Sequence, residues 1–111
     1  MFTRKLSFTK PKYSKAESLG ITEFPYYEYD SKGNQTYYEQ SNGYWFKREY
    51  DSNGIIIYYE NSNGSWERYE YDSNGNETYF EDSNGYWVKK EYDCYGKRIY
   101  YENSDSEIER Y

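Results

Sequence analysis

The stretch "EYDSNGIIIYYENSNGSWERY" at residues 49–69 is followed at once by a near copy, "EYDSNGNETYFEDSNGYWVKK", at residues 70–90. Each copy is 21 residues long and holds two Ser-Asn-Gly triplets, separated by runs rich in Tyr, Ile, Thr and Trp. Asn-Gly favours tight hairpin turns because both residues tolerate positive φ. The runs between the triplets have the composition of strands. The two copies therefore predict tandem β-hairpins.

The same unit tiles the chain from residue 28 to its end. We divide this part into four repeats, 28–48, 49–69, 70–90 and 91–111, preceded by a basic, apolar-containing segment, 1–27, that we expect to pack on the sheet. The last repeat ends in "NSDSEIERY", which lacks the second Asn-Gly and the Trp, as terminal repeats often do. The predicted fold class is all-β: an antiparallel meander of about eight short strands with an irregular N-terminal segment.

The odd length of the unit constrains its turns. If both turns were two-residue hairpins, Trp45, Trp66 and Trp87 would alternate between the two faces of the sheet. We therefore expect a three-residue loop with a bulge at Asp-Ser-Asn-Gly and a two-residue turn at Glu-Asn-Ser-Asn-Gly. The side chains then expected beside the Trp residues are Lys47, Arg68, Lys89, Glu49, Glu70, Glu91, Thr36, Ile57, Thr78, Ile99, Tyr38, Tyr59, Phe80 and Tyr101.

The opposite face is predicted to carry the positions that differ between copies. Positions that are the same in every copy meet a shared structural demand, whereas positions that differ are free to adapt to a partner. We expect the Trp face to turn inward or against residues 1–27, and the opposite face to turn outward. A sheet with a bare face can also be covered by a second copy, which makes a homodimer one expected arrangement. The constant rows predicted for the outward face are Tyr37, Tyr58, Tyr79, Tyr100, Tyr50, Tyr71, Tyr92, Glu39, Glu60, Glu81 and Glu102. Its predicted varying positions are Tyr44/Ser65/Tyr86, Phe46/Glu67/Val88, Arg48/Tyr69/Lys90 and Gln35/Ile56/Glu77/Arg98.

Composition and charge limit the possible functions. The 111 residues include 19 Tyr, 5 Phe and 3 Trp, so burial must come largely from aromatic rings. Disordered chains are poor in aromatic residues, and we expect one folded domain. Residues 1–27 carry five Lys/Arg and two acids (net +3), and residues 28–111 carry nine Lys/Arg and 18 acids (net −9), which sum to −6. An acidic body opposes direct nucleic-acid binding, for which only the N-terminal basic cluster is suited.

The repeat resembles two known families. The Glu-Tyr-Asp-x-x-Gly-Asn pattern in "EYDSNGNETYF" resembles the Tyr-Asp (YD) repeats of large bacterial toxin shells, and "YYENSNGSW" is similar to the hairpin repeats of MORN-type proteins. The resemblance covers residues 28–111 and implies antiparallel hairpins in a continuous sheet with scaffold or binding roles. A short acidic chain rich in Tyr, Asn, Lys and Ile is also similar in style to small phage proteins that inhibit bacterial defence complexes.

Metal and catalytic sites are not expected. In "DSNGN" the Gly comes fourth, whereas an EF-hand loop needs Gly at its sixth position. We expect the turn aspartates Asp30, Asp51, Asp72 and Asp93 to accept hydrogen bonds from their own turns instead. The chain has no His, so Cys94 lacks the usual base of a nucleophilic cysteine. Carboxylates that recur once per repeat indicate a structural ladder, and we predict a non-enzymatic protein without a cofactor.

The predicted function is protein binding, because Tyr and Trp are enriched at interface hot spots. An acidic Tyr/Glu face would dock on the basic surface of a nucleic-acid-handling complex, as in a phage-encoded, anti-CRISPR-like inhibitor. The alternative is a carbohydrate-binding module using the Trp/Tyr face, and a third hypothesis is a structural repeat that assembles edge to edge. The N-terminus holds no apolar run long enough for a signal peptide or a membrane span, so a cytoplasmic location is the default. The predicted protein-binding residues are Tyr37, Glu39, Tyr44, Tyr58, Glu60, Tyr69, Tyr79, Glu81 and Tyr86.

Overall fold

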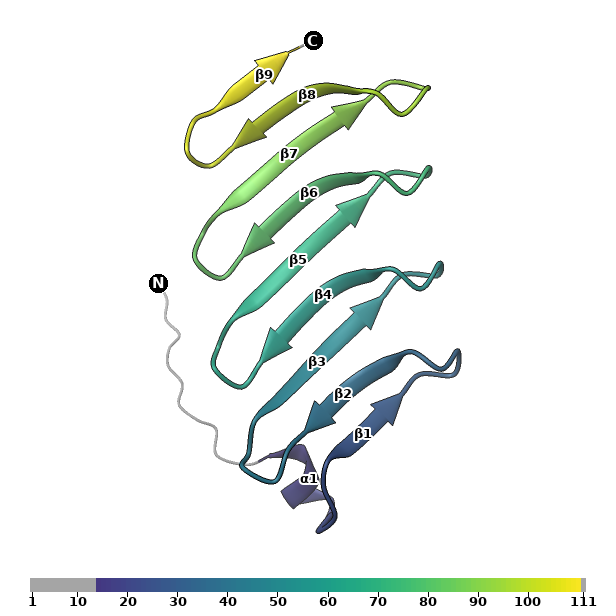
Figure 1. Cartoon of the computed structure of the whole chain (residues 1–111), viewed down its shortest axis with the longest axis vertical. Coiled ribbons are helices and arrows are strands. Elements are labelled where there is room, and N and C mark those ends of the chain that lie inside the picture. Colours follow the sequence, from purple (N-terminus) through teal and green to yellow (C-terminus); the bar gives the residue numbers. More distant parts are fainter. Residues whose placement is uncertain (1–13, 111) are drawn as a thin grey trace.

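The computed structural model describes residues 14–110, and within this range the chain forms one open antiparallel sheet of nine strands with one short helix (Figure 1). The strands lie side by side in the order in which they occur along the chain. The all-β prediction is confirmed, with nine strands in place of about eight. The elements are α1 (Lys15–Ser18), β1 (Tyr26–Tyr29), β2 (Gln35–Glu39), β3 (Trp45–Tyr50), β4 (Ile56–Asn61), β5 (Trp66–Tyr71), β6 (Glu77–Asp82), β7 (Trp87–Tyr92), β8 (Arg98–Asn103) and β9 (Ile108–Arg110).

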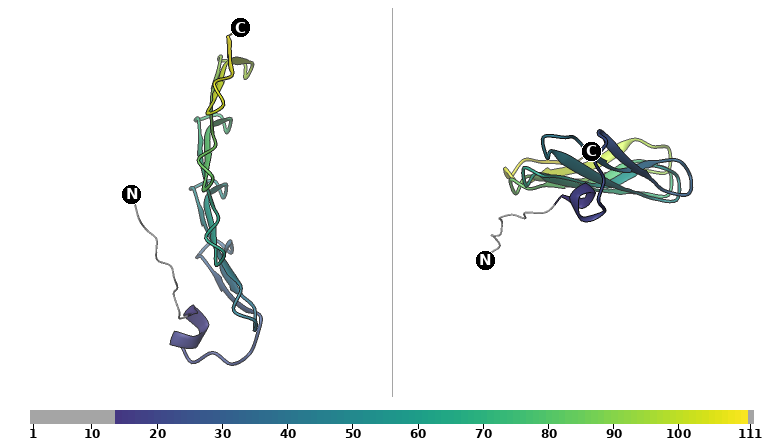
Figure 2. Two further views of the ribbon diagram at one scale, coloured as in Figure 1. Left: turned by 90° about the vertical axis from the view of Figure 1, so that its left-hand side faces the viewer. Right: turned by 90° about the horizontal axis from the view of Figure 1, so that it is seen from below.

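The sheet is a single layer, with α1 on one face at the β1 end (Figure 2). The molecule measures 54 × 36 × 18 Å. Because no second layer covers the described strands, most side chains remain half-exposed, and cross-strand pairs have to supply much of the stability. The buried side chains among residues 14–110 are Ala16, Tyr37, Glu39, Val88 and Asn103.

Both kinds of hairpin turn are three-residue loops. Asp51 N donates to Ile55 O at 2.9 Å, as expected for Asp-Ser-Asn-Gly. Gln40 N donates to Tyr44 O at 2.8 Å in the same way, and Gly43 between them has a φ of 92°. The predicted two-residue turn is therefore wrong.

The first residue of each loop explains why the turns are alike. Asp51 Oδ1 accepts from Asn53 N at 2.8 Å and from Ile55 N at 3.0 Å, and Asn61 Oδ1 accepts from Asn63 N at 2.9 Å in the next turn. An Asp or Asn side chain thus organises both turns through the same local bonds. The predicted hydrogen bonds of the turn aspartates to their own loops are confirmed.

The odd residue of the unit is a β-bulge inside the strands. The register between β3 and β4 shifts between Glu49 and Tyr50, which pair with Tyr58 and Ile56. A bulge of this kind places two residues of one strand opposite one residue of the other. The same shift occurs between β1 and β2, between β5 and β6, and between β7 and β8.

The corrected turn changes which side chains share a face. Trp45 pairs with Glu39 and Lys47 pairs with Tyr37, so the first Tyr of each pair and the following Glu lie on the Trp face. The second Tyr, such as Tyr38, lies on the opposite face with Phe46. We predicted the reverse, because a register error of one residue moves every side chain of a strand to the other face. The prediction that Trp45, Trp66 and Trp87 share one face is confirmed.

Candidate protein-binding surface

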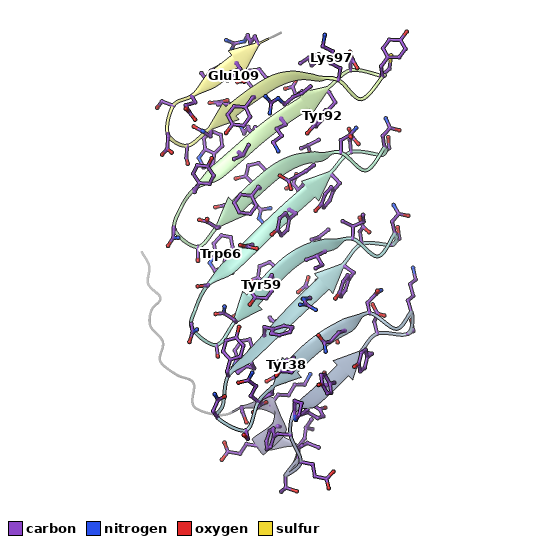
Figure 3. The ribbon with its side chains drawn as sticks, in the orientation of Figure 1. Tyr38, Tyr59, Trp66, Tyr92, Lys97 and Glu109 are labelled. Carbon is purple, nitrogen blue, oxygen red and sulfur yellow. The ribbon has the colours of Figure 1, made fainter. Side chains whose placement is uncertain are left out.

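The two faces of the sheet differ in how faithfully they repeat. The Trp face, which carries α1, has nearly the same residue types in every copy, whereas the variable face changes charge and polarity between copies. The Trp face holds Trp45, Trp66, Trp87, Tyr37, Tyr58, Tyr79, Tyr100, Glu39, Glu60, Glu81, Glu102, Lys47, Arg68, Lys89 and Arg110. The variable face holds Tyr38, Tyr59, Phe80, Tyr101, Phe46, Glu67, Val88, Glu109, Arg48, Tyr69, Lys90, Gln35, Ile56, Glu77 and Arg98 (Figure 3).

A Tyr–Glu hydrogen bond recurs on the Trp face. Tyr37 donates to Glu39 at 2.8 Å, and the equivalent bonds in β4, β6 and β8 measure 3.2, 3.2 and 2.7 Å. Burial and the neighbouring carboxylates, Glu60 foremost, raise the pKa of Tyr58 to about 12. Burial and the bond to Glu39 likewise raise the pKa of Tyr37. The hydroxyls therefore stay protonated and hold the carboxylates in place.

Cations from the preceding strand complete this ladder. Arg68 lies 2.9 Å from Glu81 and 3.2 Å from Glu70, and its Cζ lies 5.3 Å from the centroid of the Tyr79 ring. Lys47 lies 3.5 Å from Glu60. These glutamates are thus engaged inside the sheet and do not form an unneutralised acidic surface.

The first repeat lacks this cation, and α1 replaces it. Tyr26 lies 21 residues before Lys47, at the position where later strands have Lys or Arg. Lys15 of α1 instead lies 2.6 Å from Glu28, with its ammonium 5.3 Å from the Tyr37 ring centroid. Ala16 N donates to Glu39 at 3.0 Å. The helix therefore reproduces the three contacts of Arg68. Lys15 contacts Glu28 and the Tyr37 ring as Arg68 contacts Glu70 and the Tyr79 ring. The Ala16 amide contacts Glu39 as the Arg68 guanidinium contacts Glu81.

An open hollow of about 410 Å³ lies beside Arg68 and is lined mostly by residues of the Trp face. Its lining is mixed, with one aliphatic side chain among charged and aromatic ones. The residues that line it are Glu49, Ile57, Tyr58, Arg68, Tyr69 and Glu70.

A strip of aromatic rings crosses the variable face from β1 to β4. Tyr27 lies 5.5 Å from Tyr38, Tyr38 lies 5.0 Å from Phe46, and Phe46 lies 5.9 Å from Tyr59, measured between ring centroids. Tyr44 extends it at the turn, since its ring lies 6.4 Å from Phe46 and its hydroxyl 3.3 Å from that of Tyr59. We call these five residues the aromatic strip.

A second aromatic cluster lies farther along the variable face. Tyr69 lies 5.3 Å from Phe80, which lies 6.4 Å from Tyr86. It is separate from the aromatic strip because Glu67 occupies the position of Phe46 in the next repeat. Burial, together with Glu67 as hydrogen-bond partner, raises the pKa of Tyr69. The variable face thus presents two aromatic areas separated by a carboxylate.

The residues that we predicted for protein binding are divided between the faces. Tyr44, Tyr69 and Tyr86 lie in the two aromatic areas of the variable face. Tyr37 and Glu39 are covered by α1, with 7% and 1% of their surface exposed. The remaining four, Tyr58, Glu60, Tyr79 and Glu81, lie uncovered on the Trp face. Phe46 and Arg48 lie on the face opposite the Trp residues, as predicted, but were not among the predicted protein-binding residues.

Residues 14–110 hold neither a metal-binding cluster nor a membrane-spanning helix. In this part of the chain, no group of three or more Cys, His, Asp or Glu side chains is placed to hold a metal ion. The same residues contain no helix with the length and apolar character needed to cross a membrane. Cys94 is exposed in the turn between β7 and β8.

Comparison with known proteins adds no family. No protein-family model matches the chain, and no curated protein matches it either. Function is therefore inferred from the two faces of the sheet.

Proposed function

We propose that the chain is a non-enzymatic protein-binding module, built from four 21-residue hairpin repeats, that recognises its partner with the variable face. The observation that carries this proposal is the separation of the two faces. The strand positions whose charge or polarity changes most between copies all lie on the variable face: Phe46/Glu67/Val88, Arg48/Tyr69/Lys90 and Gln35/Ile56/Glu77/Arg98.

The aromatic strip is suited to anchor a protein partner. Large rings contribute most of the energy at interface hot spots, especially where neighbouring groups exclude water. Arg48 lies with its Cζ 4.5 Å from the Phe46 ring centroid and within 3.2 Å of Gln35, so a cation is held at the centre of the strip. The strip therefore combines apolar area with directional polar groups.

Charge favours a basic partner. The chain contains 20 acidic and 14 basic side chains, a net charge of −6, and residues 28–111 alone carry a net charge of −9. Such a field speeds encounter with a positive surface and opposes binding to nucleic acid itself. The partner class that we propose is a basic, nucleic-acid-handling protein, and inhibition of such a protein by a phage-encoded chain would be one form of this function.

A capture experiment with face-specific variants tests the proposal. The immobilised full chain is exposed to bacterial lysate, and the captured protein is compared with that captured by Tyr44→Ala/Tyr86→Ala and by the matched Trp-face variant Tyr58→Ala/Tyr79→Ala. We expect the variable-face variant to lose capture, the Trp-face variant to retain it, and high salt to weaken it. Capture that depends on the Trp-face pair and not on the variable-face pair would contradict the proposal.

Carbohydrate binding is the second candidate. Trp45, Trp66 and Trp87 share the Trp face, and two of them stack on Tyr rings, Trp45 on Tyr37 at 5.9 Å and Trp66 on Tyr58 at 6.5 Å between centroids. A row of flat rings can stack on sugars. Tryptophan fluorescence that does not change with any glycan of a broad panel would exclude this function.

A further inference from the structure

We propose that β1 is a dimerisation edge: two copies join their β1 strands antiparallel, about a two-fold axis normal to the sheet, into one continuous sheet. This inference does not depend on the proposed function. The described sheet is open, so β1 and β9 each have one side without a strand neighbour in this part of the chain (Figure 1). The two edges differ in ways that point to β1.

The backbone of β1 offers hydrogen-bonding groups to a second strand. Asp30 N donates to Asn34 O at 2.9 Å, so Asp30 faces inward. Residues of an antiparallel ladder alternate between facing one neighbour and facing the other. The bulge at this place adds its extra residue, Thr36, to β2, so the alternation along β1 is unbroken. The N–H and C=O groups of Glu28 therefore also face β2, whereas those of Tyr27 and Tyr29 point to the outer edge.

Large aromatic and aliphatic side chains are exposed at this edge. Tyr27 and Tyr29 are 43% and 58% exposed, and Leu19 and Phe24 in the segment before β1 are 55% and 37% exposed. β1 has four residues and no Lys or Arg, and its one charged side chain, Glu28, is already bonded to Lys15 and Tyr26. Natural edge strands are usually protected by charge, shortness or a cover, and a strand like β1 is suited to pair.

The opposite edge has that protection. β9 spans three residues, Ile108–Arg110, two of which are charged. All three are exposed. Because charge and shortness protect edge strands from pairing, pairing through β9 is disfavoured relative to pairing through β1.

A second copy fits this edge better than an unrelated strand, because both surfaces of the sheet continue across it. With Glu28 on the two-fold axis, Tyr27 pairs with Tyr29 of the second copy. The ring of Tyr29 lies 6.2 Å from Tyr27, which belongs to the aromatic strip, so the strips of the two copies join. Glu28 lies opposite Glu28 of the second copy across the axis, so the two carboxylates repel each other. Within each copy this repulsion is offset by the Lys15 ammonium and the Tyr26 hydroxyl, each of which lies 2.6 Å from the Glu28 carboxylate.

Sedimentation velocity of the full chain over a range of concentrations tests the interface. We expect the mass to rise from the monomer value of 13.6 kDa toward twice that value, with a weak, concentration-dependent dimer as is usual for a small interface. Tyr29→Lys should weaken dimerisation roughly tenfold or more, whereas the matched change on the other edge, Ile108→Lys, should leave it unchanged. A chain that stays monomeric at every concentration, or that responds only to Ile108→Lys, overturns the proposal.

A disulfide tests the register independently. Opposed residues of a pair that does not exchange hydrogen bonds have Cα atoms about 4.5 Å apart, which is within disulfide range. In a Cys94→Ser background, Glu28→Cys should therefore form a covalent dimer on mild oxidation, while Glu109→Cys on β9 should remain monomeric. Circular dichroism shows whether each variant is folded. Equal cross-linking of the two variants, or none by a folded Glu28→Cys chain, contradicts the pairing.

Discussion

The Lys15 ammonium lies 5.3 Å from the centroid of the Tyr37 ring, the distance at which the Arg68 Cζ lies from the Tyr79 ring. Lys15 belongs to a short helix and Arg68 to a strand, yet both also pair with a Glu, at 2.6 and 3.2 Å. The helix thus ends the ladder of the Trp face by supplying the cation that Tyr26 cannot. α1 is therefore a cap of the repeat array.

Removal of this cation should destabilise the β1 end. Lys15→Met keeps an unbranched, largely apolar side chain and removes the charge, so it should lower the free energy of unfolding by about 1 kcal/mol, the combined size of one exposed ion pair and one cation–π contact. Urea unfolding followed by tryptophan fluorescence measures the loss, which should shrink in high salt.

Lys97→Met is the matched control for this change. Lys97 is exposed beside the β7–β8 turn, and its loss should change stability by less than about 0.5 kcal/mol. Equal effects of the two substitutions would show that α1 does not act through its charge.

Glu39, the carboxylate covered by α1, should contribute more to stability than the equivalent glutamates of the later repeats. Glu39 is 1% exposed and accepts from both Tyr37 and the backbone of Ala16, so Glu39→Ala leaves buried donors without a partner. We expect a loss of about 2 kcal/mol and faster hydrogen exchange of the Ala16 amide. Glu60→Ala, at the uncovered equivalent position, should cost less than about 1 kcal/mol. Similar losses for both would contradict a special role of α1.

The sequence predicts the strands and turns well because Asn-Gly and Tyr-rich runs act locally. The assignment of side chains to faces failed at one kind of turn, the turn that follows Glu39 and its equivalents in the later repeats, because one more residue in a loop reverses the faces of the whole next strand. The sequence does contain a signal for the correct turn. Asn61 and Asp51 are each followed by Ser-Asn-Gly, and the shared triplet predicts the same turn at both places.

The docking of α1 was harder to predict, because it depends on a contact between segments distant in sequence. Its trace in the sequence is the Tyr at position 26, where later copies have Lys or Arg. The aromatic strip could not be predicted without the correct register, because Tyr38 of β2 and Phe46 of β3 become neighbours only when the two strands are paired correctly.

The last turn carries a strained residue that a substitution should relieve. Ser106 has a φ of 72°, at the loop position where Gly43, Gly64 and Gly85 stand with similar values. A side chain in this left-handed region costs roughly 1 kcal/mol relative to Gly. Ser106→Gly should therefore stabilise the chain by about 1 kcal/mol in urea unfolding.

The reciprocal change at the preceding turn provides the control. Apart from Gly85 itself and its two chain neighbours, no atom lies within 4 Å of the position that a Cβ would take there, so any cost of Gly85→Ser comes from the backbone and not from crowding. We expect a loss of about 1 kcal/mol. If neither substitution changes stability, backbone strain does not distinguish these loops.

Stability should fall at alkaline pH because folding raises tyrosine pKa values. Burial and nearby carboxylates raise the pKa of Tyr58 from 10.0 to about 12, and the pKa of Tyr37 and of Tyr69 is raised as well. A tyrosine whose pKa is raised by folding contributes its full stabilisation at a pH below its pKa in the unfolded chain. This contribution is lost as the pH rises through the pKa of the same tyrosine in the folded protein. The urea midpoint should therefore decline between about pH 10 and pH 12, in step with tyrosinate absorbance. Tyr58→Phe should make the decline shallower, and a midpoint that is constant over this range would exclude the linkage.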